Sequence, residues 1–366
     1  MHNIFKIHKE KLIKFGQELV NQQAARILVY PQKNSTGYWF GGGNMLKLPE
    51  GIFIVGRYRN YGDSRTGVGL GDRGLELAIF RADCFDGRFE KVKCFSKEEL
   101  SFSERKAVSI EGASLFQSGD ELQLYVSTEK DVSYPAEIKS FQKSGAGVWS
   151  IDVFSGKDII SLSTANIKTA ICSQDHAALH VKDPVVFKIP STGVVMLYGC
   201  NPFTWSSGST GMAILKDGGF QIVTNEFYPR GSVWDVAEFR ITERMPVPRL
   251  GRFKDLPPMS LYFYDGAECV RQLEEHPNAR SRPRGYSCEE IAGIAWGFDD
   301  EFPKIERLSI DSPLFISPNG TGCCRYISTL ITDDAIHCSW QQSQIDFSQP
   351  LVGHSLPMEK VEQILT

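Results

Sequence analysis

Three acidic residues, Glu111, Asp183 and Glu238, each stand at the head of a strongly apolar segment of this 366-residue chain. A carboxylate in such a position is costly to desolvate unless it is paired with a cation or serves a function. When several carboxylates converge, like charges raise the pKa of one group while nearby arginines lower the pKa of another. Such a set suits the cleavage of a glycosidic bond, which needs one protonated acid and one ionised carboxylate.

Further polar residues occupy equivalent places, either at the start of an apolar segment or in the loop that follows the next one. Asp63 lies in such a loop between Arg59 and Arg65, and these arginines are expected to keep its carboxylate ionised. Asp63 therefore joins Glu238, Asp183 and Glu111 as a catalytic candidate. The candidates for substrate binding are Asn44, Arg57, Arg59, Arg65, His180, Asp235, Arg240 and Arg325.

Several of these residues also have a purely structural interpretation. Asp183 precedes a proline and Asp63 follows a glycine, so both could be turn formers. Glu111 could be an ion-pair partner between two structural units, and His180 could be a buried histidine of the core. The sequence leaves these alternatives open.

Composition and charge exclude several classes of protein. The net charge of -4 provides no basic surface for nucleic acid. No stretch is long and apolar enough to span a membrane, and residues 1–20 lack the apolar core of a signal peptide. The nine cysteines are scattered without a C-x-x-C pair, which indicates reduced thiols in the cytoplasm and no structural zinc.

The pattern of apolar residues predicts one helix followed by many strands. Leu12, Phe15, Leu19 and Ala24 recur at helical spacing, so we expect a helix over residues 8–29. After Tyr30, short apolar runs alternate with clusters of Gly, Asp, Asn, Ser and Pro, which is typical of an all-β protein. The 23 Phe, 12 Tyr and 6 Trp suit both such a fold and the stacking of sugar rings.

The strands fall into five similar units, which open near Asn44, Glu111, Asp183, Ala237 and Gly322. The openings are roughly 55 to 85 residues apart, so four-stranded blades of roughly 40 to 50 residues would carry long loops. Blades bury their faces by packing around an axis. We predict a five-bladed β-propeller over residues 36–366 that is closed by a blade shared between the two chain ends, with a helical extension over residues 1–35.

The propeller geometry explains why the polar residues should converge. The first strand of each blade lines the axis, and its start and the loop after the second strand reach the same end of the molecule. The catalytic and binding candidates occupy these two places in different units. We therefore expect one site at that end of the axis.

The segment His180-Val-Lys-Asp-Pro-Val-Val-Phe, followed by Gly193 and Met196-Leu-Tyr, resembles the third blade of arabinanases. The chain from about Gly41 to Trp340 is similar in pattern to the five-bladed propeller glycosidases, which include arabinanases, β-xylosidases, invertases and levansucrases. This resemblance implies that Asp183 modulates the pKa of a general acid. It also implies that Glu238, in Trp234-Asp-Val-Ala-Glu-Phe-Arg-Ile, is that acid.

Two features depart from the family. Its first blade opens with an aspartate that activates water, but the matching residue here is Asn44, which cannot act as a base. Asp63 is the expected substitute and Glu111 the next candidate. The fifth blade often supplies a histidine near a central calcium, but the matching stretch from Ser317 to Arg325 has none, so we predict no metal and no other cofactor.

These observations favour a glycoside hydrolase that acts on the end of a short oligosaccharide, or on a furanoside or pyranoside glycoside. Two alternatives remain. Arg57, Arg59 and Arg65 could hold phosphate in place of water, which would make the protein a glycoside phosphorylase. Alternatively, Asn44 could mark a sugar-binding propeller without catalytic activity.

Overall fold

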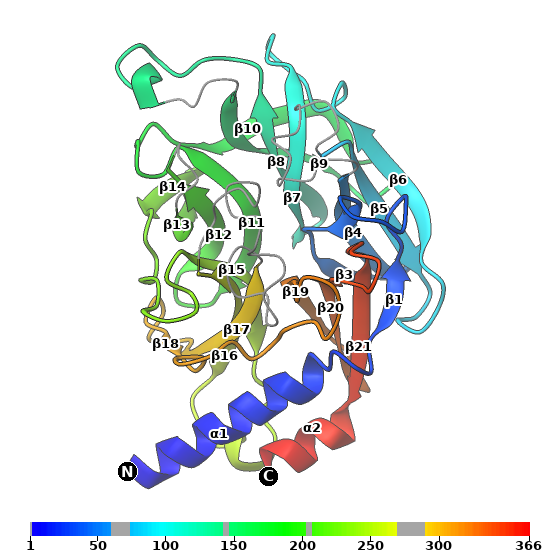
Figure 1. Ribbon diagram of the computed structural model, residues 1–366, viewed down its shortest axis with the longest axis vertical. Coiled ribbons are helices and arrows are strands. Elements are labelled where there is room, and N and C mark those ends of the chain that lie inside the picture. The colour runs from blue at the N-terminus through cyan, green and yellow to red at the C-terminus, as the bar shows by residue number, and fades with distance from the viewer. Residues whose placement is uncertain (1, 60–73, 142–145, 203–206, 269–289) are drawn as a thin grey trace.

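The computed structural model describes residues 2–59, 74–141, 146–202, 207–268 and 290–366, with side chains from residue 7 onward. Its strands form five antiparallel sheets around a common axis, which confirms the predicted five-bladed β-propeller (Figure 1). Each sheet is one blade, and one edge strand of each blade lies nearest the axis.

The strands of the first four blades follow one another along the chain. Blade 1 contains β2 (Trp39–Gly41), β3 (Met45–Leu48), β4 (Gly51–Arg59), β5 (Glu76–Ala82) and β6 (Glu90–Ser96). Blade 2 contains β7 (Ala107–Ser118), β8 (Glu121–Lys130), β9 (Val148–Gly156) and β10 (Ser163–Cys172). Blade 3 contains β11 (His180–Ile189), β12 (Gly193–Asn201), β13 (Ser209–Lys216) and β14 (Gly219–Thr224). Blade 4 contains β15 (Glu238–Pro246), β16 (Met259–Ala267), β17 (Ile291–Phe298) and β18 (Glu306–Arg307).

Blade 5 combines the two ends of the described chain. It contains β19 (Cys324–Ile331), β20 (Ala335–Gln342) and β21 (Leu351–Pro357), and its outer strand is β1 (Arg26–Val29), which pairs antiparallel with β21. The prediction of a shared closing blade is thus confirmed. Joining both ends in one sheet closes the ring with backbone hydrogen bonds and leaves β21 without an open edge.

The N-terminal helix is shorter at its C-terminal end than the sequence pattern predicts. Helix α1 spans His2–Leu19, whereas the prediction of a helix over residues 8–29 includes the strand β1. The Asn21 side chain accepts hydrogen bonds from the backbone N–H groups of Gln23 and Ala24, a turn that ends the helix. Pairing with β21 then buries Leu28 and Val29, so tertiary contacts override the helical periodicity.

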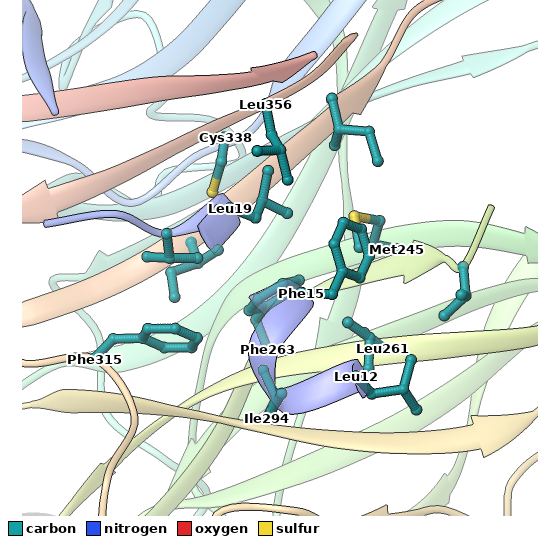
Figure 2. Close-up of a cluster of buried hydrophobic side chains, with 14 of the residues drawn as sticks. Leu12, Phe15, Leu19, Met245, Leu261, Phe263, Ile294, Phe315, Cys338 and Leu356 are labelled. Atoms are coloured by element: carbon teal, nitrogen blue, oxygen red, sulfur yellow. The ribbon is translucent and has the colours of Figure 1, made fainter. Parts of the chain in front are cut away.

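A second helix, α2 (Met358–Leu365), follows β21 and packs beside α1 outside the ring (Figure 1). The sequence interpretation did not include it. Leu12, Phe15 and Leu19 of α1 are buried against apolar residues from blades 4 and 5, as Figure 2 shows for Phe263 and Leu356. Two short 3₁₀ helices, Lys139–Phe141 and Gly251–Phe253, lie in connections.

The inner strand of each blade is irregular near the axis. The pairing of β7, β11, β15 and β19 with the next strand shifts register, and in blade 1 the inner strand is split into β2 and β3. At these irregular places, Gly42, Asp183 and Tyr326 have φ values of 74°, 54° and 54°. This left-handed backbone is uncommon for residues other than glycine, and more so for tyrosine than for aspartate; such conformations cluster at functional sites.

In the described part of the chain no helix is long and apolar enough to cross a membrane. Its seven cysteines are all free thiols.

Candidate active site

The inner strands of the five blades are linked through polar contacts near the axis. The backbone N–H of Ala113 in blade 2 donates to Gly42 O in blade 1 at 2.8 Å. The preceding backbone N–H in blade 2, that of Gly112, donates to Asp183 Oδ1 in blade 3 at 2.9 Å. Tyr326 N in blade 5 donates to the Asp265 carboxylate in blade 4 at 3.3 Å. Charged side chains from all five blades therefore meet at one place.

We call this group the axial cluster. It consists of Arg57, Glu111, Lys182, Asp183, Glu238, Arg240, Asp265, Glu290, Arg325 and Tyr326. Its carboxyl groups outnumber its cationic side chains by one. With every group ionised, the cluster would carry surplus negative charge in a buried place, so the arrangement favours a proton on at least one carboxyl group.

Arg240 is the centre of the axial cluster. Its Nη1 lies 3.2 Å from Asp183 Oδ2 and 3.3 Å from Glu238 Oε1. Its Nη2 lies 2.7 Å from Asp265 Oδ2 and 3.1 Å from Glu290 Oε1. One buried guanidinium thus contacts four carboxyl groups, which it holds at fixed positions around its plane.

Two of these carboxyl groups have raised pKa values. Burial raises the pKa of Glu238. The positive charge of Arg240 opposes this shift, whereas the negative charge of the nearby Glu290 adds to it. Burial also raises the pKa of Asp265 to about 7, again against the opposing charge of Arg240. Both groups are therefore biased toward the neutral acid.

Glu290 has the opposite electrostatic character. Burial alone would raise its pKa, but Arg325 and Arg240 together hold the pKa at about 2. Arg325 Nη1 donates to Glu290 Oε2, while Arg240 Nη2 contacts Oε1. The pair Glu238 and Glu290 thus combines a carboxyl group that favours its proton with one that is firmly ionised.

Glu111 is held by a different arginine. Arg57 donates to Glu111 Oε2 from Nε at 3.3 Å and from Nη2 at 3.1 Å. Because Arg57 belongs to blade 1 and Glu111 to blade 2, this ion pair joins two blades, as the structural interpretation of Glu111 expected. Tyr326 reaches both Arg57, at 3.3 Å, and Asp183, at 3.5 Å, through its hydroxyl group.

Cationic side chains at the margin of the axial cluster are also nearly enclosed. Burial lowers the pKa of Lys182, although the neighbouring Asp183 and Glu111 oppose this effect. The guanidinium groups of Arg59 and Arg325 each lie over the ring of Trp39, 4.3 Å and 4.4 Å from its centroid. Such stacking fixes the direction in which each arginine points.

The structure brings most of the sequence candidates together. Glu111, Asp183, Glu238, Arg57, Arg240 and Arg325 belong to the axial cluster, and Arg59 lies beside it on Trp39. Asp63 and Arg65 lie outside the described residues.

Three other candidates make their contacts elsewhere. The Asn44 amide accepts from Leu115 N at 2.8 Å and donates to Leu115 O at 3.0 Å, so it tethers blade 1 to blade 2. His180 is fully buried beside Trp149, with 5.7 Å between the ring centroids. Asp235 contacts Arg307 at 2.8 Å and Tyr264 at 3.2 Å. A binding role for these residues stays a prediction.

Asp265, Glu290 and Tyr326 were missed by the sequence interpretation. Asp265 ends the apolar run Leu261-Tyr-Phe-Tyr on a second strand, and Glu290 immediately precedes the apolar strand β17. An acid beside an apolar segment was the same signal that identified Glu238. However, site residues were expected only at the start of first strands and in the loops after second strands, whereas Asp265 lies on a second strand and Glu290 precedes a third.

The described residues contain no group of three or more His, Cys, Asp or Glu side chains placed to hold a metal ion. The carboxyl groups around Arg240 surround a guanidinium instead. Cationic side chains of the protein itself thus offset part of their charge.

Solved structures share this architecture over almost the entire chain. A BT0996 complex with RGII is similar with a TM-score of 0.65 and 12% identity, and the match covers 95% of each protein. A structure described as a glycoside hydrolase has a TM-score of 0.64 and 12% identity, with 94% of each protein covered. The β-1,2-mannobiose phosphorylase from Listeria innocua, in complex with β-1,2-mannobiose, has a TM-score of 0.55 and 14% identity, covering 92% of this chain and 96% of that one.

No protein-family model and no curated protein sequence matches the chain. The similarity to solved structures therefore concerns the fold. At that level, the resemblance to five-bladed propeller glycoside hydrolases is confirmed.

Proposed function

We propose that this protein is a glycoside hydrolase in which Glu238 is the general acid. The observation that carries this proposal is the contrast between two neighbouring carboxyl groups. Burial raises the pKa of Glu238, whereas Arg325 and Arg240 hold Glu290 ionised. Cleavage of a glycosidic bond requires a protonated and an ionised carboxyl group close together.

The near enclosure of the axial cluster supports an enzyme that acts on the end of a short oligosaccharide, or on a small furanoside or pyranoside glycoside. The charged groups around Arg240 are buried or nearly so, which suits a narrow pocket better than an open groove. Glycoside hydrolases and a mannobiose phosphorylase among the structural neighbours are consistent with a carbohydrate substrate. We further propose that the reaction takes place in the cytoplasm and uses no cofactor.

Asp183 fits the role of positioning the acid. Its Oδ2 and Glu238 Oε1 contact the same nitrogen of Arg240, and its Oδ1 accepts from Gly112 N. Removal of the Asp183 charge would therefore move Arg240 and change the protonation of Glu238. The sequence candidates for the second carboxylate, Asp63 and Glu111, stay predictions.

The test is Glu238→Gln, assayed against furanosides and pyranosides with good and poor leaving groups. The amide matches the carboxyl group in shape but cannot donate a proton. Turnover of a glycoside with a poor leaving group should fall by roughly 10² to 10⁴-fold. An activated aryl glycoside should lose much less, because its leaving group needs little protonation.

Glu243→Gln is the matched control. Glu243 lies on the same strand, β15, and burial raises its pKa to about 7, but it accepts a hydrogen bond from Thr329 N at 3.0 Å. This variant should keep its activity. A Glu238→Gln protein with unchanged turnover on poor leaving groups would exclude Glu238 as the acid.

A glycoside phosphorylase is the second candidate function, which the mannobiose phosphorylase among the structural neighbours favours. Arg57, in the axial cluster, and Arg59, beside it, belong to the arginines expected to hold phosphate. Turnover that depends on inorganic phosphate and releases a sugar phosphate would identify a phosphorylase. Equal rates with and without phosphate would identify a hydrolase.

A non-catalytic sugar-binding propeller is the third interpretation. It predicts that the wild-type protein binds a glycoside without cleaving it, and that Glu238→Gln binds equally well. Calorimetry of both proteins, together with product analysis, distinguishes this case from an enzyme.

A further inference from the structure

Glu290 differs from the other carboxyl groups of the axial cluster in its exposure. Its side chain is 18% exposed, compared with 4% for Asp183 and Glu238 and 0% for Asp265. It immediately precedes β17, the third strand of blade 4, whereas Glu238 begins the inner strand of the same blade. Glu290 is thus the carboxylate around Arg240 that a substrate can reach most directly.

The position of Glu290 relative to Glu238 is set by Arg240. The guanidinium places Glu238 on Nη1 and Glu290 on the adjacent Nη2. In glycosidases that react through a covalent intermediate, the two carboxyl groups lie about 5 Å apart, because one of them attacks the sugar directly. Glu238 and Glu290 contact neighbouring nitrogens of one guanidinium, and the charge of Glu290 acts on Glu238.

Arg325 and Arg240 keep Glu290 ionised, as a nucleophilic carboxylate must be. With its pKa at about 2, the group is a weak base for water, because general bases work best when their pKa is near the operating pH. The same stabilisation makes it a good leaving group from an ester. An ionised carboxylate that accepts one arginine contact on each oxygen still has lone pairs available for attack.

The other carboxyl groups are less suitable. Asp183 accepts from Gly112 N, Arg240 and the Tyr326 hydroxyl group. Asp265 is fully buried, and its raised pKa favours the neutral acid. Glu111 has a side-chain exposure of 6% and is paired with Arg57.

We propose that Glu290 is the nucleophile of a double-displacement reaction. This proposal rests on the proposed function of Glu238 as the acid. Glu290 Oε attacks the anomeric carbon while the glycosidic C–O bond breaks and the leaving oxygen takes the proton of Glu238. The sugar is then an ester of Glu290. Glu238, now ionised, removes a proton from water, whose oxygen attacks the anomeric carbon and releases the Glu290 carboxylate. The product keeps the anomeric configuration of the substrate.

The decisive experiment uses the wild-type protein. For whichever glycoside of the panel it cleaves, NMR during the first turnovers should show retention of configuration. The corresponding 2-deoxy-2-fluoro glycoside with a good leaving group should inactivate the enzyme and add one sugar to the peptide that contains Glu290. Inversion of configuration, or a label on another residue, would overturn the proposal.

Variants provide an independent test. Glu290→Gly should lose turnover by roughly 10³-fold or more, and added azide should restore rate and yield a glycosyl azide of inverted configuration. Glu290→Asp should remain folded with a much reduced rate of the first step. Wild-type rates in either variant would contradict a nucleophilic role, and Glu243→Gln again serves as the control.

These outcomes separate the two proposals. A wild-type protein that cleaves no glycoside, with or without phosphate, removes the proposed function itself. A protein that cleaves glycosides and depends on Glu238, but inverts configuration, keeps the proposed function and excludes Glu290 as the nucleophile.

Discussion

The axial cluster and the ion pair Lys130–Asp152 in blade 2 are both buried, yet they differ in composition. Lys130 Nζ lies 3.0 Å from Asp152 Oδ2 and donates to Leu100 O at 2.7 Å. Asp152 also accepts hydrogen bonds from the hydroxyl groups of Thr128, Ser150 and Thr169. This pair has one cation, one anion and a set of neutral donors, all from one blade and its connections.

The axial cluster instead draws charged groups from different blades and contains more carboxyl groups than cations. Its neighbouring groups Glu238 and Glu290 have pKa values shifted in opposite directions. Burial of charge is common to both places and therefore does not identify a site. Convergence from several blades and opposed pKa values distinguish the axial cluster.

The largest expected contrast in stability and turnover comes from matched amide substitutions in the axial cluster and in the Lys130–Asp152 ion pair. Asp152→Asn leaves the Lys130 charge without its anion and should lower the free energy of unfolding by about 3 kcal/mol or more. Its turnover per folded molecule should equal that of the wild type. Glu238→Gln should show the reverse, with a large loss of turnover and a stability change below about 1 kcal/mol, since the amide resembles the neutral acid. Denaturant unfolding and kinetics on both proteins test the contrast, and an equal loss of turnover in both would contradict it.

A smaller expected effect is the pH dependence of the free energy of unfolding that Asp265 contributes. The pKa of Asp265 is raised from 3.8 to about 7 by burial, so the folded protein binds its proton more tightly than the unfolded chain does. The stabilising contribution is complete below pH 3.8 and is lost as the pH rises toward about 7. Asp265→Asn should therefore lose less stability between pH 5 and pH 8 than the wild type does, by on the order of 1 to 3 kcal/mol. Parallel curves for the two proteins from denaturant unfolding would assign the pH dependence to other groups.

Asn44 should give the smallest effect, and it tests whether a polar residue close to the axis behaves as part of the site. Asn44→Ala removes two hydrogen bonds to the backbone of Leu115, so it should reduce the free energy of unfolding by about 1 to 2 kcal/mol. KM should be unchanged if the tether is its whole role. A raised KM in a protein of wild-type stability would instead support the predicted binding role.

The sequence predicted the propeller and the convergence of its acids because both follow from a repeated local pattern. Glu111, Asp183 and Glu238 each begin or follow the start of an apolar inner strand, and the ring architecture brings such positions to one axis. Glu290 escaped the same reasoning. Its approach to Arg240 depends on how β17 begins within blade 4, which no repeat in the sequence specifies.

The C-terminal end of α1 likewise separates what local sequence predicts from what tertiary contacts decide. Leu12, Phe15 and Leu19 follow a helical period and are buried on one face of the helix, as predicted. Residues 26–29 fall within the predicted helix, but β21 offers them backbone hydrogen bonds and a buried position in the closing blade. The choice between helix and strand was therefore made by a segment at the opposite end of the chain.

The sequence by itself determined the number of blades, the apolar faces that pack them and the acids at the heads of the inner strands, because periodicity and residue type are local properties. Only the tertiary structure decided which acid has a raised pKa and which has a lowered one. A pKa depends on burial and on charges a few ångströms away, and Arg240 and Arg325 reach Glu290 from different strands. Their distances to the carboxyl groups exist only once the ring has closed.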